Sequence, residues 1–180
     1  MRSFTKLLPA LSDYPDDIVV TADDDIYYNS DWLEKLCREH IVHPRDIICH
    51  RVHRVSFFSN GHMMPYNSWP HQSNIADASY KNFLTGVGGV LYPPHCLHRD
   101  VTKVKTFQAL CPFADDIWFW AMAVLNGTKI RNLSNGYAKL EYTNRTSELG
   151  LNSQETLAKS NVIQNGNDVQ MVRVLKHYPN

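Results

Sequence analysis

The sequence predicts an α/β fold in which one mixed sheet is flanked by helices. Two observations carry this prediction: helical and strand-like segments alternate along the chain, and no internal repeat or low-complexity linker separates them. Of the 180 residues, 43% are hydrophobic and 20% are charged, which is typical of a globular chain and excludes disorder as its main state. The length suits one ordinary domain, and we expect residues 1–180 to form it.

The first part of the chain is expected to contain two helices and a strand. Residues 3–11 place apolar side chains on one face of a short helix. The β-branched run at 18–22 predicts a buried central strand. Ser30 is a suitable N-cap for a helix that continues to about residue 41 and stops before Pro44. Its apolar stripe would consist of Trp32, Leu33, Leu36, Cys37 and Ile41.

Two strands are expected in the middle of the chain. Residues 46–58 form the first, and Asn60-Gly61 forms a turn after it. Residues 83–92 form the second, which is unusual because it contains three glycines, Gly86, Gly88 and Gly89. Glycines within a strand mark either a bulge or the close approach of a ligand or a neighbouring backbone. Both interpretations remain open.

The last part of the chain is expected to be mainly helical. Residues 114–125 fit a helix that is closed by Asn126-Gly127, and a short strand follows at 128–133. Two further helices are expected near 153–162 and 167–177.

Charge and hydropathy exclude several classes of partner. The formal net charge is 0, with 18 basic and 18 acidic residues, so no general attraction to nucleic acid or to an anionic membrane is expected. No run approaches the roughly 18 apolar residues of a transmembrane helix. The apolar stretch at 7–11 is too short for a signal peptide, and we expect a soluble, cytoplasmic protein. Reduced, buried thiols are expected, because no CxxC pair occurs among Cys37, Cys49, Cys96 and Cys111.

The triplet Asp23-Asp24-Asp25 follows directly on the strand expected at 18–22. Three adjacent carboxylates repel one another, so a divalent cation would supply the missing positive charge. Alternation along an extended chain places Asp23 and Asp25 on the same side, where both can approach one Mg²⁺ or Mn²⁺ ion. Ligands of open α/β sheets also gather at the carboxyl ends of strands. The alternative is a solvated acidic turn before the next helix.

A second acidic pair, Asp115-Asp116, begins the helix expected at 114–125. Acidic residues in a first turn are favoured by the helix dipole, which is the purely structural interpretation. The pair precedes a strongly apolar segment that must be buried, so the carboxylates would be held rigidly, as a general base has to be. The sequence leaves open whether the two acidic sites meet in space.

Histidines and basic residues provide weaker signals. Histidines recur three residues apart at 40 and 43, 50 and 53, and 95 and 98, but no HExxH pattern supports a zinc site. Most basic residues near these segments are expected on solvated faces, and one or two of them would hold a diphosphate if they lie near the acidic centre. The residues concerned are Arg51, Arg54, Arg99, Lys103 and Lys105.

Three blocks of sequence together resemble the GT-A type of glycosyltransferase, of the kind found in bacterial surface-polysaccharide synthesis. Residues 18–28 are similar to the strand and DxD motif of that family, and residues 83–92 form the second block. Residues 111–119 are similar to its ED or DD motif before a helix. The order and spacing of the blocks are more specific than any one of them. The resemblance covers roughly residues 1–130 and implies a single-domain, GT-A-like (Rossmann-like) fold.

The resemblance implies a donor site with a metal ion. Asp23 and Asp25 would bind Mn²⁺ or Mg²⁺ at the diphosphate of a nucleotide-sugar, and Asp24 would lie near the donor ribose or sugar. Thr85 and Gly86 would line the sugar pocket.

The resemblance also implies a catalytic pair and an acceptor. Asp116 would deprotonate an acceptor hydroxyl or steady an oxocarbenium-like centre, with Asp115 as its partner. The acceptor would be a glycan or a lipid-linked sugar in polysaccharide biosynthesis. The protein would act in the cytoplasm or peripherally at the inner face of the membrane.

The start of the chain departs from the GT-A pattern. GT-A domains begin with a strand and helix unit that holds the nucleobase, whereas only 17 residues precede the strand expected at 18–22. We therefore expect an N-terminally shortened domain: either the chain is a truncated or differently started product, or a homo-oligomer or a partner subunit supplies what is missing.

Two other functions compete with the transferase. One is a haloacid-dehalogenase-like phosphohydrolase, although that family requires Thr or Val where this chain has Tyr27. The other is a non-catalytic remnant or interaction module that has kept the fold and lost donor binding.

Overall fold

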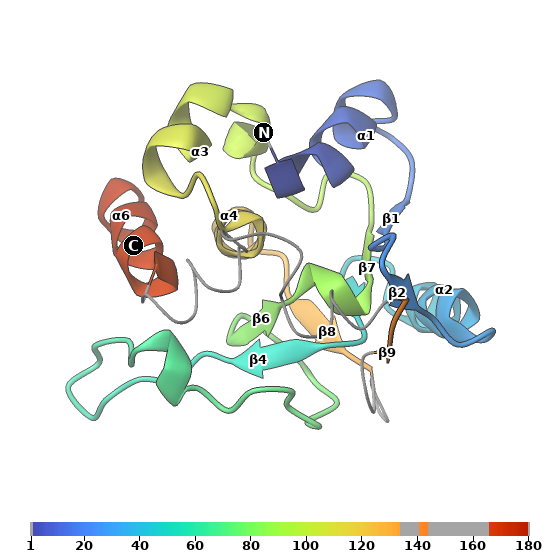
Figure 1. Cartoon of the computed structure of the whole chain (residues 1–180), viewed down its shortest axis with the longest axis horizontal. Coiled ribbons are helices and arrows are strands. Elements are labelled where there is room, and N and C mark those ends of the chain that lie inside the picture. Colours follow the sequence, from blue (N-terminus) through green and yellow to red (C-terminus); the bar gives the residue numbers. More distant parts are fainter. Residues whose placement is uncertain (1, 134–140, 144–165, 180) are drawn as a thin grey trace.

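The centre of the molecule is a five-stranded mixed sheet (Figure 1). The computed structural model describes residues 2–133, 141–143 and 166–179. Strands β3 and β8 of the sheet are parallel, and its other neighbouring pairs are antiparallel. In spatial order the strands are β1 (Val19–Thr21), β7 (Val90–Tyr92), β3 (Ile47–Cys49), β8 (Ile130–Asn132) and β5 (Ala78–Ser79). The predicted mixed sheet is confirmed.

Two small antiparallel sheets accompany the central one. They pair β2 (Ile26–Tyr27) with β9 (Glu141–Tyr142), and β4 (Val52–Arg54) with β6 (Asn82–Leu84).

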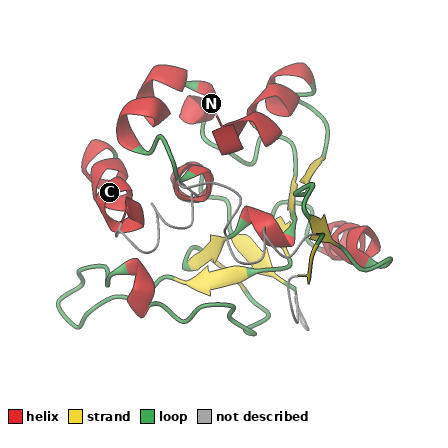
Figure 2. Ribbon diagram, in the orientation of Figure 1, coloured by secondary structure: helices red, strands yellow, loops and turns green. Residues whose placement is uncertain are grey.

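Helices flank the strands, as the sequence predicts (Figure 2). None of the described helices is both long and apolar enough to cross a membrane. The α-helices are α1 (Leu8–Asp13), α2 (Trp32–Val42), α3 (Val104–Leu110), α4 (Asp115–Leu125) and α6 (Gly166–His177). The 3-10 helices are η1 (Arg2–Lys6), η2 (Tyr66–Ser68), η3 (Gly86–Gly88) and η4 (Arg99–Thr102).

Alternate residues of the sheet face two separate apolar clusters. In β3, Ile47 and Cys49 belong to the large cluster that includes α4, whereas Ile48 belongs to a small cluster with Leu36 of α2. Leu91 of β7 belongs to the small cluster as well. This period of two is that of a strand covered on both faces, and Figure 1 shows β7 between α4 and α2.

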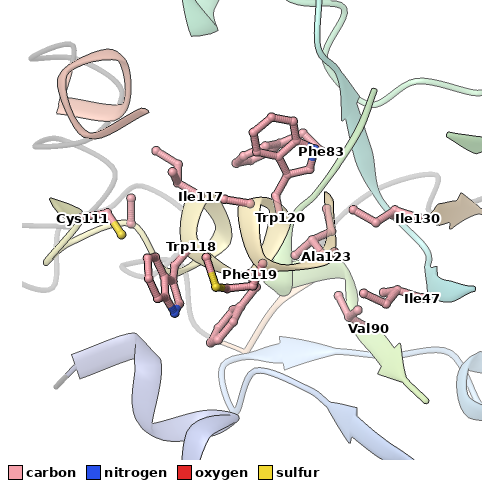
Figure 3. Packing of buried hydrophobic residues seen from close by; sticks show 14 of the residues in the cluster. Ile47, Phe83, Val90, Cys111, Ile117, Trp118, Phe119, Trp120, Ala123 and Ile130 are labelled. Atoms are coloured by element: carbon pink, nitrogen blue, oxygen red, sulfur yellow. The ribbon is translucent and has the colours of Figure 1, made fainter. Parts of the chain in front are cut away.

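Helix α4 is the centre of the large cluster. Every side chain from Ile117 to Ala123 is buried, so this helix has no solvent-facing stripe over those residues. In Figure 3, Trp120 points toward Phe83 of β6, and their ring centroids are 6.0 Å apart. Trp118 projects toward the side on which Cys111 lies. The start of α4 is therefore fixed by packing on several sides of the helix.

Several predicted elements are confirmed, but the strand at 18–22 has a different place in the sheet from the predicted one. The helices at 114–125 and 167–177, the strand at 128–133 and the turn at Asn60-Gly61 are all found, with small shifts of their ends. The helix predicted at 153–162 lies outside the described residues. The strand predicted at 18–22 is present as β1, but it is an edge strand and not the central one. Val19 and Val20 are only half-buried, whereas Thr21 is buried, and β1 pairs with β7 on one side alone.

The two long strands of the prediction are each divided. Residues 46–58 form β3 and β4, which belong to different sheets, and residues 83–92 form β6 and β7 with η3 between them. In the helix predicted at 3–11, the chain instead forms η1 and then α1, and Phe4, Leu7 and Leu8 are buried as expected.

Helix α2 differs from the prediction in its cap and in its apolar face. Asp31 and not Ser30 is the N-cap residue, and it makes no capping side-chain hydrogen bond. Only Leu36 of the expected stripe is fully buried, whereas Leu33 and Ile41 are exposed. Cys37 is exposed too, while the other three cysteines are buried, and all four are free thiols.

Candidate functional site

A pocket of about 360 Å³ lies beside the carboxyl end of β1. Asp23 and Asp25 line it from the loop after β1, and Asp115 and Asp116 line it from the first turn of α4. The structure thus brings together the two acidic motifs that the sequence could only treat separately. Ser3, Tyr66, Tyr142 and Asn167 add neutral polar groups to the lining.

Tyr28 holds the acidic loop against the glycine segment. Its hydroxyl accepts a hydrogen bond from the Asp23 backbone N–H at 2.9 Å and donates one to the Val87 carbonyl at 3.0 Å. The Tyr28 ring also packs on Trp32, with 4.6 Å between ring centroids. The Tyr28 hydroxyl therefore connects the Asp23 backbone to η3, and the packing of its ring on Trp32 holds it there.

Asp116 is held by the backbone of the glycine segment. The Gly86 N–H donates to Asp116 Oδ1 at 3.0 Å. A Cβ atom at position 86 would lie 2.5 Å from Lys6 Nζ and 3.2 Å from Asp116 Oδ1. A side chain at position 86 would therefore displace the Lys6 ammonium group and crowd the Asp116 carboxylate.

Among the residues that the structure describes, Lys6 is the one basic residue that lines this pocket. Its Nζ lies 3.1 Å from Asp23 Oδ1 and 3.7 Å from Asp115 Oδ2. Burial would lower the pKa of Lys6, but the negative charges of Asp116, Asp115 and Asp23 outweigh burial and raise it well above its usual value. The Lys6 ammonium group is therefore positively charged at neutral pH.

Sequence reasoning missed Lys6. It belongs to no motif, and it lies 17 residues from Asp23 in the chain. No local signal identifies it, because Lys6 lies off the apolar face that Phe4 and Leu7 form, where a lysine is ordinarily solvated.

The pKa of Asp116 is shifted toward neutrality. Burial, followed by the adjacent charge of Asp115, raises the pKa of Asp116 to about 7, while Lys6 and the Gly86 N–H act in the opposite direction. Part of the Asp116 surface still opens into the pocket. A carboxylate with this pKa can accept a proton near neutral pH more effectively than an ordinary aspartate.

The three predicted donor-binding residues, Asp24, Thr85 and Gly86, all lie outside the pocket lining. Asp24 is exposed at the turn between its two neighbours. Thr85 is buried, and its Oγ1 accepts a hydrogen bond from Arg51 Nη1 at 2.9 Å. Gly86 contributes through its backbone N–H alone.

The remaining glycines of the segment are explained by neighbouring protein atoms. A Cβ at Gly88 would lie 2.7 Å from Arg51 Cβ, and one at Gly89 would overlap the Trp32 ring. Close approach by neighbouring atoms is therefore the observed explanation of these glycines. Arg51 approaches Gly88 and Trp32 approaches Gly89, whereas the site residues Lys6 and Asp116 approach Gly86.

The other candidate residues have structural partners. Arg54 pairs with Asp77 at 2.8 Å and Lys103 with Asp100 at 2.8 Å. His50 contacts the Trp32 carbonyl at 3.0 Å. His53 stacks on His71, and burial lowers the pKa of His53 to about 3, so it stays neutral.

The donor chemistry of the pocket suits a hard divalent cation. Asp23 and Asp25 offer carboxylate oxygens, which Mg²⁺ and Mn²⁺ prefer. Asp115 Oδ2 is buried and has no hydrogen-bond partner among the described residues. In the described ranges, however, no three His, Cys, Asp or Glu side chains are grouped as a metal site. The residue types fit the ion, and Lys6 provides the positive charge beside Asp23.

Comparison with known proteins adds no family to this description. The chain matches no family model, no curated protein and no solved structure.

Proposed function

We propose that this protein is a metal-dependent, GT-A-like glycosyltransferase that uses a nucleotide-sugar donor and a glycan or lipid-linked acceptor. One observation carries the proposal: Asp23 and Asp25 share a pocket with Asp115 and Asp116, although the two motifs are far apart in the sequence. The pocket also adjoins the carboxyl end of a strand, where open α/β sheets bind their ligands.

Asp23 and Asp25 would hold Mn²⁺ or Mg²⁺ in this proposal. The ion supplies positive charge that stabilises the departing nucleoside diphosphate. The carboxylates supply hard oxygen ligands, and Tyr28 keeps the Asp23 backbone in place through its contact with Val87. Asp24, on the exposed side of the turn, would meet the donor only from outside the pocket.

Asp116 would be the general base. It accepts the proton of the acceptor hydroxyl as the new bond from oxygen to the sugar carbon forms and the bond from sugar to phosphate breaks. A pKa of about 7 suits this step, because about half of the carboxyl groups are ionised at neutral pH and the carboxylate binds a proton well. The Gly86 N–H fixes one oxygen of Asp116, and Asp115 lies beside it in the same helical turn.

Donor binding tests the proposal. Calorimetry with UDP- and GDP-sugars in the presence of Mn²⁺ should detect binding by the wild type. Asp25→Asn should weaken it about tenfold or more, since a charged oxygen ligand is lost. The matched control is Asp31→Asn, which removes an exposed carboxylate paired with Lys35 at 2.8 Å and should leave donor affinity unchanged. Equal donor affinities of the wild type and Asp25→Asn would contradict the metal site. Absence of binding with every donor would favour the non-catalytic remnant.

A further inference from the structure

Lys6 connects the two acidic motifs of the pocket. Its ammonium group is within hydrogen-bonding distance of Asp23 Oδ1, at 3.1 Å, and at 3.7 Å from Asp115 Oδ2. The first carboxylate follows β1 and the second begins α4, so one side chain from η1 spans both elements. About a quarter of the Lys6 side chain is exposed, and this part faces the pocket.

The charges of the pocket are unbalanced without a further cation. Four carboxylates line it, and Lys6 is the basic side chain among its described lining residues. Asp115 is only 7% exposed, yet its Oδ2 lacks a hydrogen-bond partner in the described part of the chain. A buried carboxylate oxygen of this kind is costly unless a cation or donor reaches it. The Lys6 ammonium group lies closer to the Asp23 carboxylate than to the Asp115 carboxylate.

We propose that Lys6 is an internal counter-ion that competes with the divalent cation for Asp23. Binding of the ion displaces the ammonium group from Asp23 Oδ1, and the flexible four-carbon stem lets it turn toward Asp115 Oδ2. After this exchange the Lys6 ammonium group is the partner of Asp115 Oδ2, and the divalent cation is bound by the Asp23 carboxylate. The inference rests on the proposed function, because it concerns the same ion.

Titration with Mn²⁺ alone tests this exchange without any sugar or turnover. Calorimetry at fixed ionic strength should give a dissociation constant for Lys6→Met that is about tenfold lower than that of the wild type, because the competing charge is gone. Lys6→Arg keeps the charge and should stay close to the wild type. Lys6→Gln is a second neutral variant that retains polar character, and it should also bind Mn²⁺ more tightly.

A surface lysine provides the matched control. Lys35 pairs with Asp31 at 2.8 Å on the solvent-facing side of α2. Lys35→Met therefore removes one positive charge at a site outside the pocket and should leave Mn²⁺ affinity unchanged. Thermal unfolding followed by circular dichroism establishes that each variant is folded.

The outcomes separate this inference from the proposed function. If the wild type binds Mn²⁺ and the neutral Lys6 variants bind it equally or more weakly, the exchange is refuted and the metal-dependent transferase stands. If neither the wild type nor any variant binds Mn²⁺, the exchange is refuted together with metal dependence. Tighter binding by both neutral variants, with Lys6→Arg and Lys35→Met unchanged, supports the exchange.

Discussion

Gly89 occupies a position where both the backbone and a neighbour exclude a side chain. Its φ is +92°, in the left-handed region, and an added Cβ would overlap the Trp32 ring. Gly89→Ala should therefore lower the free energy of unfolding by about 2–4 kcal/mol, from backbone strain and overpacking together. Urea denaturation measures the loss.

Gly61 is the control for Gly89. Its φ of +83° gives similar backbone strain, but no atom lies within 4 Å of an added Cβ. Gly61→Ala should cost only about 1 kcal/mol. If the two variants lose the same stability, Trp32 does not restrict position 89.

Asp116 should make the stability of the protein depend on pH. Its pKa is about 7 in the folded chain and near 3.8 without the surrounding protein. Between these values the folded state binds more protons, so the free energy of unfolding falls as pH rises and levels off above about pH 7. Asp116→Asn should remove this dependence. Its stability relative to the wild type should then rise by roughly 2 kcal/mol between about pH 5 and about pH 8.

The comparison is made by urea denaturation with EDTA present, so that no metal ion alters the titration. Other groups, including His53, titrate in both proteins and cancel in the difference. A stability difference that is constant with pH would show that Asp116 has an ordinary pKa.

At the scale of elements, the sequence predicted best where a long apolar run had a clear stop signal. Helix α4 was predicted almost to its ends, because its uninterrupted apolar residues precede an Asn-Gly stop. The division of β3 from β4 was not predicted, because His50 and Arg51, which separate them, are polar without being strong breakers. The glycines between β6 and β7 did provide a signal, but it was interpreted as a bulge or a close approach within one strand. The division of both predicted strands follows from pairing with strands distant in sequence, which local patterns do not contain.

Asn82 joins three of these strands. It is fully buried in β6, and its Nδ2 donates to the Ile130 carbonyl of β8 at 2.9 Å. Its Oδ1 accepts a hydrogen bond from Arg54 Nη1 of β4 at 2.6 Å. Asn82→Ala should lower the free energy of unfolding by about 2–4 kcal/mol, because it leaves buried polar partners unsatisfied.

Asn74 is the control for Asn82. It lies exposed in the loop between β4 and β5, and Asn74→Ala should change stability by no more than about 0.5 kcal/mol. Thermal and urea unfolding of both variants measure the contrast. A loss at Asn82 as small as that at Asn74 would mean that the side chain does not join the strands.

At the scale of the whole molecule, four of the five acids that the sequence singled out line one pocket, and Asp24 does not. The sequence did not predict what brings the four together. Asp23, Asp25, Asp115 and Asp116 were all singled out, because carboxylates at a strand end or a helix start are visible in the sequence. Lys6 was not, since its role depends on where η1 packs against β1 and α4. Thr85 was expected in the sugar pocket, but its hydroxyl contacts Arg51, a pairing that no local pattern indicates.

The segment that carries Lys6 is also part of the core of the whole molecule. Phe4 is 1% exposed and stacks on Phe107 of α3, with 4.2 Å between ring centroids, and it meets Phe119 of α4 edge-on. Phe4→Ala should therefore lower the free energy of unfolding by about 3–5 kcal/mol. Phe58→Ala, at a position 49% exposed, should cost less than about 1 kcal/mol.

Urea unfolding followed by tryptophan fluorescence and by circular dichroism distinguishes a global effect from a local one. Trp118 and Trp120 of α4 are two of the four tryptophans, so a single transition seen by both probes means that packing around the tryptophans and secondary structure are lost together. A lowered midpoint of that single transition in Phe4→Ala places η1 in the same cooperative unit. If Phe4→Ala leaves the midpoint unchanged, η1 is not part of the cooperative core. Lys6 would then be held beside Asp23 by its ion pairs alone and not by the packing of its neighbours.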